Sequence, residues 1–286
     1  MDQKFLNACK NGNIDIVIHL LQNSSLDPSA EDNLAIRIAA FYGHLQVVEL
    51  LLQDSRVDPS DVDNQAIKSA AGNGYLQIVK LLLTDSRVDP SAGNNYAIRW
   101  VAYYGHCDIV KLLLQDPRVD PSAQNNEAIR WAADNDHRDI VELLLRDSHV
   151  DPSAQNNQAI RNAAFKGHIK IVELLLQDPR VDSSADNNYA IRWSAHNNHI
   201  KIVELLLRDP RVDPSADNNW AIKEVANYDY LQVVELLLTD PRVESADAIT
   251  IASENDDREI VELLEQHQYK IDNMYYNKLA TKLLFS

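Results

Sequence analysis

The chain has 286 residues, of which 45% are hydrophobic, and its seven glycines and ten prolines are too few for a disordered or collagen-like protein. It has no apolar run near the ~18 residues of a membrane span, no secretion signal at its N-terminus and only two cysteines, which predicts a soluble protein of the cytoplasm, with the nucleus as an alternative. Its formal net charge of −16 repels polyanions such as nucleic acid and acidic membrane surfaces, and slightly favours basic partners.

A repeat of 31 residues organises the sequence. Its anchor is a column of Gly, Asn or Asp that recurs at this spacing and, at the last step, after 27 residues, at Gly12, Gly43, Gly74, Gly105, Asp136, Gly167, Asn198, Asp229 and Asp256. Glycine adopts left-handed dihedrals freely, and Asn and Asp tolerate them best among the other residues. The column therefore predicts a helix end in each of nine units, which we expect to form one continuous domain.

The units at the two ends differ from those in the middle. The first has Phe5 where the others have isoleucine, and the loop between Thr239 and Asp247 is four residues shorter than its equivalents. The stretch MYYNKLATKLLFS from Met274 resembles one unpaired helix. In chain order we predict an N-terminal capping repeat, six 31-residue repeats, a shortened repeat, a last repeat and a C-terminal capping helix, at residues 1–30, 31–216, 217–243, 244–270 and 271–286.

Each unit contains two helical patterns. In the fourth unit the first helix is predicted over residues 96–104, preceded by Asn94 and Asn95, either of which could cap its free N–H groups. The second helix is predicted over residues 107–115, whose apolar side chains are spaced for burial on one side. The segment DPRVDPSA that follows contains two prolines, which resist helix continuation and predict a loop to the next unit.

The order xAIRxAAxxGHxxIVxLLL resembles the ankyrin repeat, whose pattern is TPLHxAAxxGHxxxVxxLL in about 33 residues. The most specific part is AAxxGHxxIVELLL, as at residues 163–176. The resemblance covers almost the whole chain and implies an all-α solenoid of about nine helix-turn-helix units in a curved, right-handed-type stack. Because each unit is two residues short in the inter-unit loop, we expect the family's projecting β-hairpin to be reduced or absent. The DPSA and AIR signatures are also similar to ankyrin arrays of large DNA viruses of amoebae.

A helical wheel at 100° per residue separates two faces of the first helix. The positions of Ala97, Ile98, Val101 and Ala102 stay small or aliphatic in the other units, so we expect them to build the stack. The remaining arc of about 100° lines the concave groove in the ankyrin family. We predict that the partner-binding residues are the aromatic side chains on this arc, Phe41, Tyr42, Tyr96, Trp100, Tyr103, Tyr104, Trp131, Phe165, Tyr189, Trp193 and Trp220. The alternative is that these rings only lean on neighbouring units and cover loop backbone.

A basic column lies beside this arc, at Arg37, Lys68, Arg99, Arg130, Arg161, Arg192 and Lys223. One hypothesis pairs it with the aspartates that recur at the same period, Asp58, Asp89, Asp120, Asp151, Asp182 and Asp213, as an internal ion-pair ladder. The other makes it a track for phosphate or carboxylate groups.

Histidines recur after the predicted helix end, at His44, His106, His137, His168 and His199. Their spacing of one repeat is too wide for a shared metal ion, so we expect them to cap or to form hydrogen bonds. The chain has no glycine-rich phosphate loop, no nucleophile elbow and no CxxC pair. We therefore expect no catalytic residues, no metal, no cofactor and no enzymatic activity.

The function that these patterns favour is that of a monomeric scaffold or adaptor, which binds a basic or extended protein partner through the aromatic groove. The first alternative is phosphate or nucleic-acid binding through the basic column. The second is a substrate adaptor for a ubiquitin ligase without its own F-box. Only about 16 residues follow the ninth unit, which is too few for the F-box-like tail that poxvirus ankyrin proteins often carry.

Overall fold

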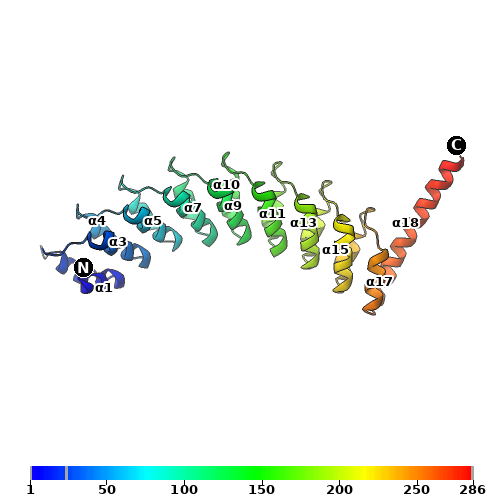
Figure 1. Ribbon diagram of the computed structural model, residues 1–286, viewed down its shortest axis with the longest axis horizontal. Helices are drawn as coiled ribbons and strands as arrows, with labels where there is room; N and C mark the ends of the chain where they lie inside the picture. Colours follow the sequence, from blue (N-terminus) through cyan, green and yellow to red (C-terminus); the bar gives the residue numbers. More distant parts are fainter. Residues whose placement is uncertain (1, 23–24, 285–286) are drawn as a thin grey trace. The chain divides into compact units, whose positions relative to one another are not determined.

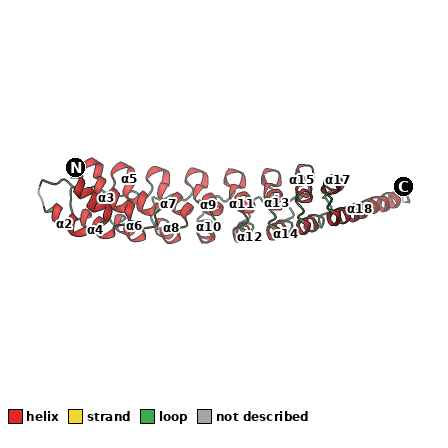
Figure 2. Ribbon diagram, turned by 90° about the horizontal axis from the view of Figure 1, so that it is seen from below, coloured by secondary structure: helices red, strands yellow, loops and turns green. Residues whose placement is uncertain are grey.

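The computed structural model describes residues 2–22 and 25–284, which form helices and no strands (Figures 1 and 2). The helices come in pairs, one pair for each predicted unit. The first helices of the pairs are α1 (Gln3–Asn11), α3 (Ala30–Tyr42), α5 (Asp61–Gly72), α7 (Ala92–Tyr104), α9 (Ala123–Asp134), α11 (Ala154–Lys166), α13 (Ala185–His196), α15 (Ala216–Asn227) and α17 (Ala246–Glu254). The second helices are α2 (Ile14–Leu21), α4 (Leu45–Leu52), α6 (Leu76–Leu82), α8 (Cys107–Leu113), α10 (Arg138–Leu145), α12 (Ile169–Leu175), α14 (Ile200–Leu206), α16 (Leu231–Leu237) and α18 (Arg258–Leu284).

The chain consists of two compact units, residues 1–151 with α1 to α10 and residues 152–286 with α11 to α18. Within each unit every first helix packs against the first helix of the next repeat, and the second helices do the same. Each helix also packs against its partner in the pair. This arrangement confirms the predicted helical solenoid. The expectation that all nine repeats form one continuous domain stays a prediction.

The side chains buried between the repeats are those that the helical wheel placed on the inner face of the first helices. The alanine column and the isoleucine column beside it are fully buried at Ala35, Ala66, Ala97, Ala128, Ala159, Ala190, Ala221 and Ala248, and at Ile36, Ile67, Ile98, Ile129, Ile160, Ile191 and Ile222. Alanine has no bulk beyond Cβ, so neighbouring first helices approach closely, and isoleucine fills the space beside it. Each fully buried isoleucine contributes about 1.5 to 3 kcal/mol.

The anchor column ends the first helices as predicted. All nine of its residues have φ between 57° and 82°, including Asp136, Asn198, Asp229 and Asp256. Some of the glycines meet a second requirement. At Gly105 an added Cβ would lie 2.5 Å from Cε1 of the His137 ring, so only glycine lets the next repeat come this close.

The asparagines before the first helices do not cap them, in contrast to the expectation for Asn94 and Asn95. In seven repeats three consecutive residues turn left-handed, with φ of 51° to 65°, before the right-handed helix starts. In the fourth repeat these residues are Gly93, Asn94 and Asn95. Asparagine is common in the turn because it is the non-glycine residue, together with Asp, that tolerates these dihedrals best.

The third residue of each left-handed turn is an asparagine that bonds to the next repeat. Its Oδ1 accepts the backbone N–H of the loop residue 25 positions later, over 2.7 to 2.9 Å. The donors for Asn33, Asn64, Asn95, Asn126, Asn157, Asn188 and Asn219 are Asp58, Asp89, Asp120, Asp151, Asp182, Asp213 and Glu244. Most of these asparagines are buried. The bond therefore fixes the loop of one repeat to the turn of the repeat before it.

A second bridge between loops is made by arginine. Arg211 forms a fork with Asp209, two residues before it, and donates from Nη1 to the carbonyl of Val181 at 2.7 Å. Arg118 does the same with Asp116 and Val88. Hydrogen bonds from Arg211, and secondarily from the Ser183 hydroxyl, lower the pKa of the Asp209 carboxyl from 3.8 to about 2.

The last repeat departs from the others. It lacks four residues before α17, and with them the left-handed turn, so α17 follows Ser245 directly. Its second helix, α18, runs from Arg258 to Leu284 without a break. The separate capping helix expected at residues 271–286 is therefore the C-terminal part of α18, because no glycine or proline stops that helix; residues 285 and 286 lie outside the described chain.

We predict that Asn157→Gly destabilises the chain by about 1 to 3 kcal/mol, because the partly buried N–H of Asp182 loses its acceptor while the left-handed backbone is still tolerated. Asn157→Ala should cost about 1 to 2 kcal/mol more, since alanine is strained at this φ. Urea unfolding measures both. Equal stability of the glycine variant and the parent chain would show that the bridge is not needed.

The lowered pKa of Asp209 also predicts acid lability. A carboxyl with a pKa depressed in the folded state stabilises it above pH 4, and this contribution disappears as the pH falls towards 2. Thermal unfolding followed by circular dichroism from pH 5 to 2 should therefore show a steeper loss of stability for the parent chain than for Asp209→Asn. Parallel curves for the two proteins would contradict the assignment.

Candidate functional site

In the first unit the predicted aromatic residues gather around Trp100. Its ring lies 5.3 Å from Tyr96 and 5.6 Å from Tyr104 on the same helix, α7, and 5.5 Å from Trp131 on α9, between ring centroids. Tyr103 contacts both tryptophans edge-on. None of these side chains belongs to the buried core, and half of Tyr104 is exposed. The structure thus brings five of the predicted residues into one cluster.

In the second unit the rings gather around Trp193 on α13. Its ring lies 5.7 Å from Phe165, 5.6 Å from Tyr189 and 5.4 Å from Trp220. Four predicted residues therefore lie together here as well. Each unit presents its own aromatic surface on its first helices.

Sequence reasoning missed two members of the second cluster, His196 and Tyr228. The His196 ring lies 5.2 Å from Trp193 and 5.3 Å from Tyr228, and its Nδ1 lies 3.0 Å from a Glu224 carboxylate oxygen. Nearly half of Tyr228 is exposed. The position of His196 in the repeat could have indicated its place in the cluster, because it is the position of Tyr103 and Phe165.

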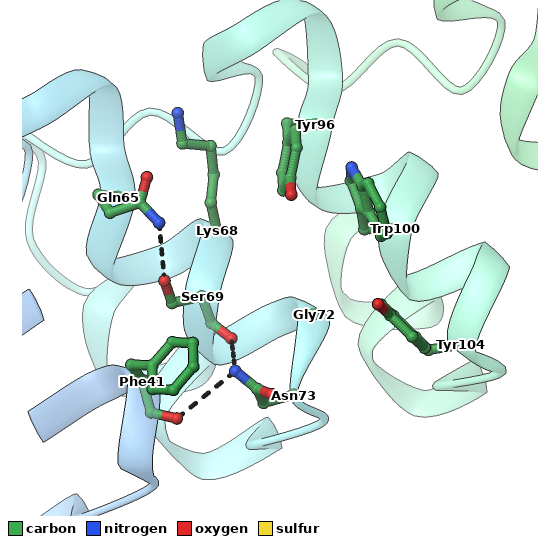
Figure 3. Close-up of a pocket in the computed structure, with 9 residues that line it drawn as sticks. All are labelled: Phe41, Gln65, Lys68, Ser69, Gly72, Asn73, Tyr96, Trp100 and Tyr104. Atoms are coloured by element: carbon green, nitrogen blue, oxygen red, sulfur yellow. Dashed lines mark hydrogen bonds between the residues drawn. The ribbon is translucent and has the colours of Figure 1, made fainter. Parts of the chain in front are cut away.

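Phe41 and Tyr42, at the end of α3, lie apart from the Trp100 cluster. Between Phe41 and the rings of α7 is a hollow of about 230 Å³ (Figure 3). It is lined by Phe41, Gln65, Lys68, Ser69, Gly72, Asn73, Tyr96, Trp100 and Tyr104. The polar side chains that form its floor come from α5 and from Asn73 just after it, and because they are not aromatic, their sequence did not indicate a binding site.

Residues of the basic column form hydrogen bonds to the backbone of the left-handed turns. Arg192 donates from Nε to the carbonyl of Asn187 at 2.9 Å, and its Nη1 pairs with Asp217 at 2.7 Å. Arg99 donates to the carbonyls of Asn94 and Gly93 in the same way. Arg37 makes these two bonds to Asp32 and Glu31. The guanidinium fork satisfies carbonyls that the reversal of handedness leaves outside the helix.

The ion-pair hypothesis for this column named the wrong acids for the residues whose partners are seen. Arg99 pairs with Glu127, Arg192 with Asp217 and Lys68 with Asp63. The loop aspartates expected instead accept hydrogen bonds inside their own loop, and two of them, Asp58 and Asp213, also lie within 4.0 Å of the loop arginines Arg87 and Arg242. Asp89, for example, accepts both the N–H and the hydroxyl of Ser91.

The basic column and the aromatic surfaces are in contact. Arg192 stands over the Trp220 ring at 5.5 Å, Arg161 over Tyr189 at 5.2 Å and Lys68 over Tyr96 at 5.6 Å. In each pair the ring belongs to the repeat after the cation. Cation–π contact is worth about 0.5 to 2 kcal/mol, so these cations support the rings from one side.

The histidine column forms hydrogen bonds between repeats, as expected. Nε2 of His137 lies 2.9 Å from the carbonyl of Tyr103, and Nε2 of His199 lies 3.0 Å from that of Phe165. His44 reaches Lys10 at 2.7 Å and His106 reaches Gly72 at 3.2 Å. Because a carbonyl only accepts, each of these rings donates. Each ring thus provides a donor for a backbone carbonyl near the C-terminal end of the first helix in the preceding repeat.

Among the side chains that the structure describes, no three of His, Cys, Asp or Glu lie where they could hold a metal ion. No helix in the described part of the chain combines the length and the apolar character needed to cross a bilayer.

Family models match both units. The model of ankyrin repeats in three copies matches residues 5–94 and 67–156, and the model of a single ankyrin repeat matches residues 186–219. The chain belongs to the ankyrin repeat family. Ankyrin repeats are protein–protein interaction modules and are typically not enzymes. No individual curated protein matches the chain, and the resemblance to arrays of amoebal viruses stays a prediction.

A structural role for the basic column predicts that Arg192→Gln destabilises this ankyrin array by about 1 to 3 kcal/mol in urea unfolding, because charged hydrogen bonds to Asn187 and Asp217 are lost. Arg208→Gln is the control. Arg208 lies two residues after the end of α14, is 69% exposed and pairs with Glu204, four residues before it, so its loss should cost under about 0.5 kcal/mol. Equal effects of the two substitutions would contradict the structural role.

Proposed function

We propose that this ankyrin array is a scaffold or adaptor that binds a protein partner through the two aromatic surfaces on its first helices. The observation that carries the proposal is the separation of the rings from the core. The buried core consists mainly of alanine, isoleucine, valine and leucine, whereas Phe41, Tyr104 and Phe165 keep 49%, 50% and 38% of their surface exposed. The stacking of repeats therefore does not require these rings.

The rings suit binding for a physical reason. Tyrosine and tryptophan bury a large area and lose little conformational entropy, and they dominate binding energy at protein interfaces. Here they are also held in place beforehand. Trp100 touches four neighbouring rings, and Trp193 touches three rings and His196. A partner would meet a surface that is already ordered, which lowers the entropy lost on association.

The expected partner is an extended, basic protein segment. Repeats distribute their side chains along a line, so a segment that contacts several first helices gains more than a compact one. The net charge of −16 attracts basic segments at long range. A monomeric array in the cytoplasm belongs to the same proposal.

The basic column gives less support to phosphate or nucleic-acid binding. The side chains of Arg99 and Arg192 are only 13% exposed, and their guanidinium groups already bind carbonyls, carboxylates and rings. A polyanion would have to break these contacts. The role of ubiquitin-ligase adaptor depends on what the partner does, and the aromatic surfaces do not favour it over other scaffolds.

We predict that Trp100→Ala and Trp193→Ala each weaken partner binding, by about 2 kcal/mol or thirtyfold at the better-placed ring. The partner is captured from cells with the full chain as bait, purified, and titrated against each variant by calorimetry. Unfolding in urea should change little for both variants, because both rings lie outside the core.

The control is Ile129→Ala. Ile129 is fully buried, so this substitution should cost about 2 to 5 kcal/mol of stability through a cavity. If the tryptophan variants lose as much stability as the Ile129 variant and bind the partner normally, the rings are structural. A steep loss of affinity with rising salt would favour polyanion-like contact instead.

A further inference from the structure

The hollow in the first unit lies where the ring pattern of the first helices is interrupted. Ser69 on α5 occupies the repeat position of Trp100, Trp131 and Trp193. Gln65 takes the position of Tyr96 and Tyr189, and Gly72 that of Tyr103 and Phe165. The hollow is therefore the space that aromatic side chains of this repeat would fill.

Rings stand on both sides of this space. Tyr96, Trp100 and Tyr104 follow one another along α7 and form one wall, and Phe41 of α3 stands opposite (Figure 3). Trp100 and Tyr104 are close to parallel, with 28° between their planes, and Tyr96 is tilted from Trp100 by 30°. In neighbouring repeats the two tryptophan rings touch directly, as Trp100 and Trp131 do at 5.5 Å. A ring placed above Ser69 would continue this contact towards Phe41.

The floor of the hollow offers hydrogen-bond acceptors. Gln65 donates from Nε2 to the Ser69 hydroxyl at 2.9 Å, and Asn73 donates from Nδ2 to the carbonyls of Ser69 and Phe41 (Figure 3). These bonds orient the two side-chain amides. Neither amide oxygen has a hydrogen-bond donor among the described residues. Both are therefore able to accept from a ligand.

We propose that the hollow binds the side chain of a tryptophan or tyrosine in the partner segment, which completes the ring column. The inference rests on the proposed function and names the residue type that the surface selects. The ring would stack between Phe41 and the α7 wall, and its N–H or O–H would donate to Gln65 or Asn73. The net charge of −16 favours basic residues on either side of it in the segment.

Other side chains fit the lining less well. No carboxylate lines the hollow, and the ammonium group of Lys68 stands at its edge, held by Asp63 at 2.8 Å, so an arginine would enter against a like charge. A carboxylate would face the amide oxygens and the electron-rich ring faces. A leucine would fill part of the space but bring no donor for the amide oxygen of half-buried Gln65, which costs about 1 to 3 kcal/mol if that oxygen loses its water.

The test uses saturation-transfer NMR with the full chain and three probes, the N-acetyl amides of tryptophan, leucine and arginine. The tryptophan amide should receive the strongest saturation. Ser69→Trp places a tryptophan where the fourth repeat has Trp100, so the new ring should fill the hollow. It should reduce that signal at least tenfold. Asn162→Trp is the matched control, because it adds a tryptophan at the same repeat position in the second unit, and it should leave the signal unchanged.

Gly72→Phe is a second filling variant. A Cβ at Gly72 meets no atom within 4 Å, so the fold should accept the new ring, and circular dichroism checks this. It should also remove the signal. Equal saturation of the leucine or arginine amide, or a tryptophan signal that survives in both filling variants, would overturn the proposal.

Titration of the captured partner separates this inference from the proposed function. Loss of affinity in Trp193→Ala, in Ser69→Trp and in Gly72→Phe supports both. Loss in Trp193→Ala alone supports the aromatic surfaces and overturns the role of the hollow, because Trp193 belongs to the second unit and does not line it. Normal affinity in all three variants overturns both.

Discussion

One hydrogen bond determines the register of the repeats, the bond from the third residue of the left-handed turn to the loop of the next repeat. Because it joins Oδ1 of Asn157, for example, to a backbone N–H 25 residues later, it sets both where the first helix begins and how far the next loop can slide. A helix whose first residue is fixed is also fixed in rotation. The same side chains therefore face inward in each repeat that carries this bond, and the same side chains face outward.

This rotation explains how one short helix serves two purposes. Its inner side consists of small or aliphatic residues, mainly alanine and isoleucine, which allows neighbouring helices to pack closely. Its outer side is free to change, so Ser69, Trp100 and Trp131 occupy one position without disturbing the stack. The guanidinium groups of arginines such as Arg192 donate to backbone carbonyls of the left-handed turn and also stand over rings of the outer surface, so they connect this surface to the turn.

Much of this was predictable from periodicity, because a repeated sequence shows which positions the fold constrains. The helix ends at the Gly, Asn and Asp column, the buried columns and the exposed aromatic residues all follow from it. The role of Asn94 and Asn95 did not, because an asparagine before a helix suits a cap as well as a left-handed turn, and only the backbone distinguishes them. The acids that pair with Arg99 and Arg192 were missed because they lie in the variable columns. The hollow above Ser69 was missed because it arises where large side chains are lacking, and this becomes visible only when the positions of the neighbouring rings are known.

The short loop before α17 has a consequence for how such an array can grow. Each complete repeat accepts a loop N–H from the repeat after it. If a whole internal unit is duplicated or lost, the same asparagine-to-loop hydrogen bond can therefore form at every new junction. The ninth repeat has lost the left-handed turn and its third asparagine, so it offers no such acceptor to a tenth. Copies of an internal repeat would keep this bond at each new junction, whereas a copy of the ninth would create a junction without it. Duplication of an internal repeat therefore preserves the loop contacts of the array better than duplication of the last one.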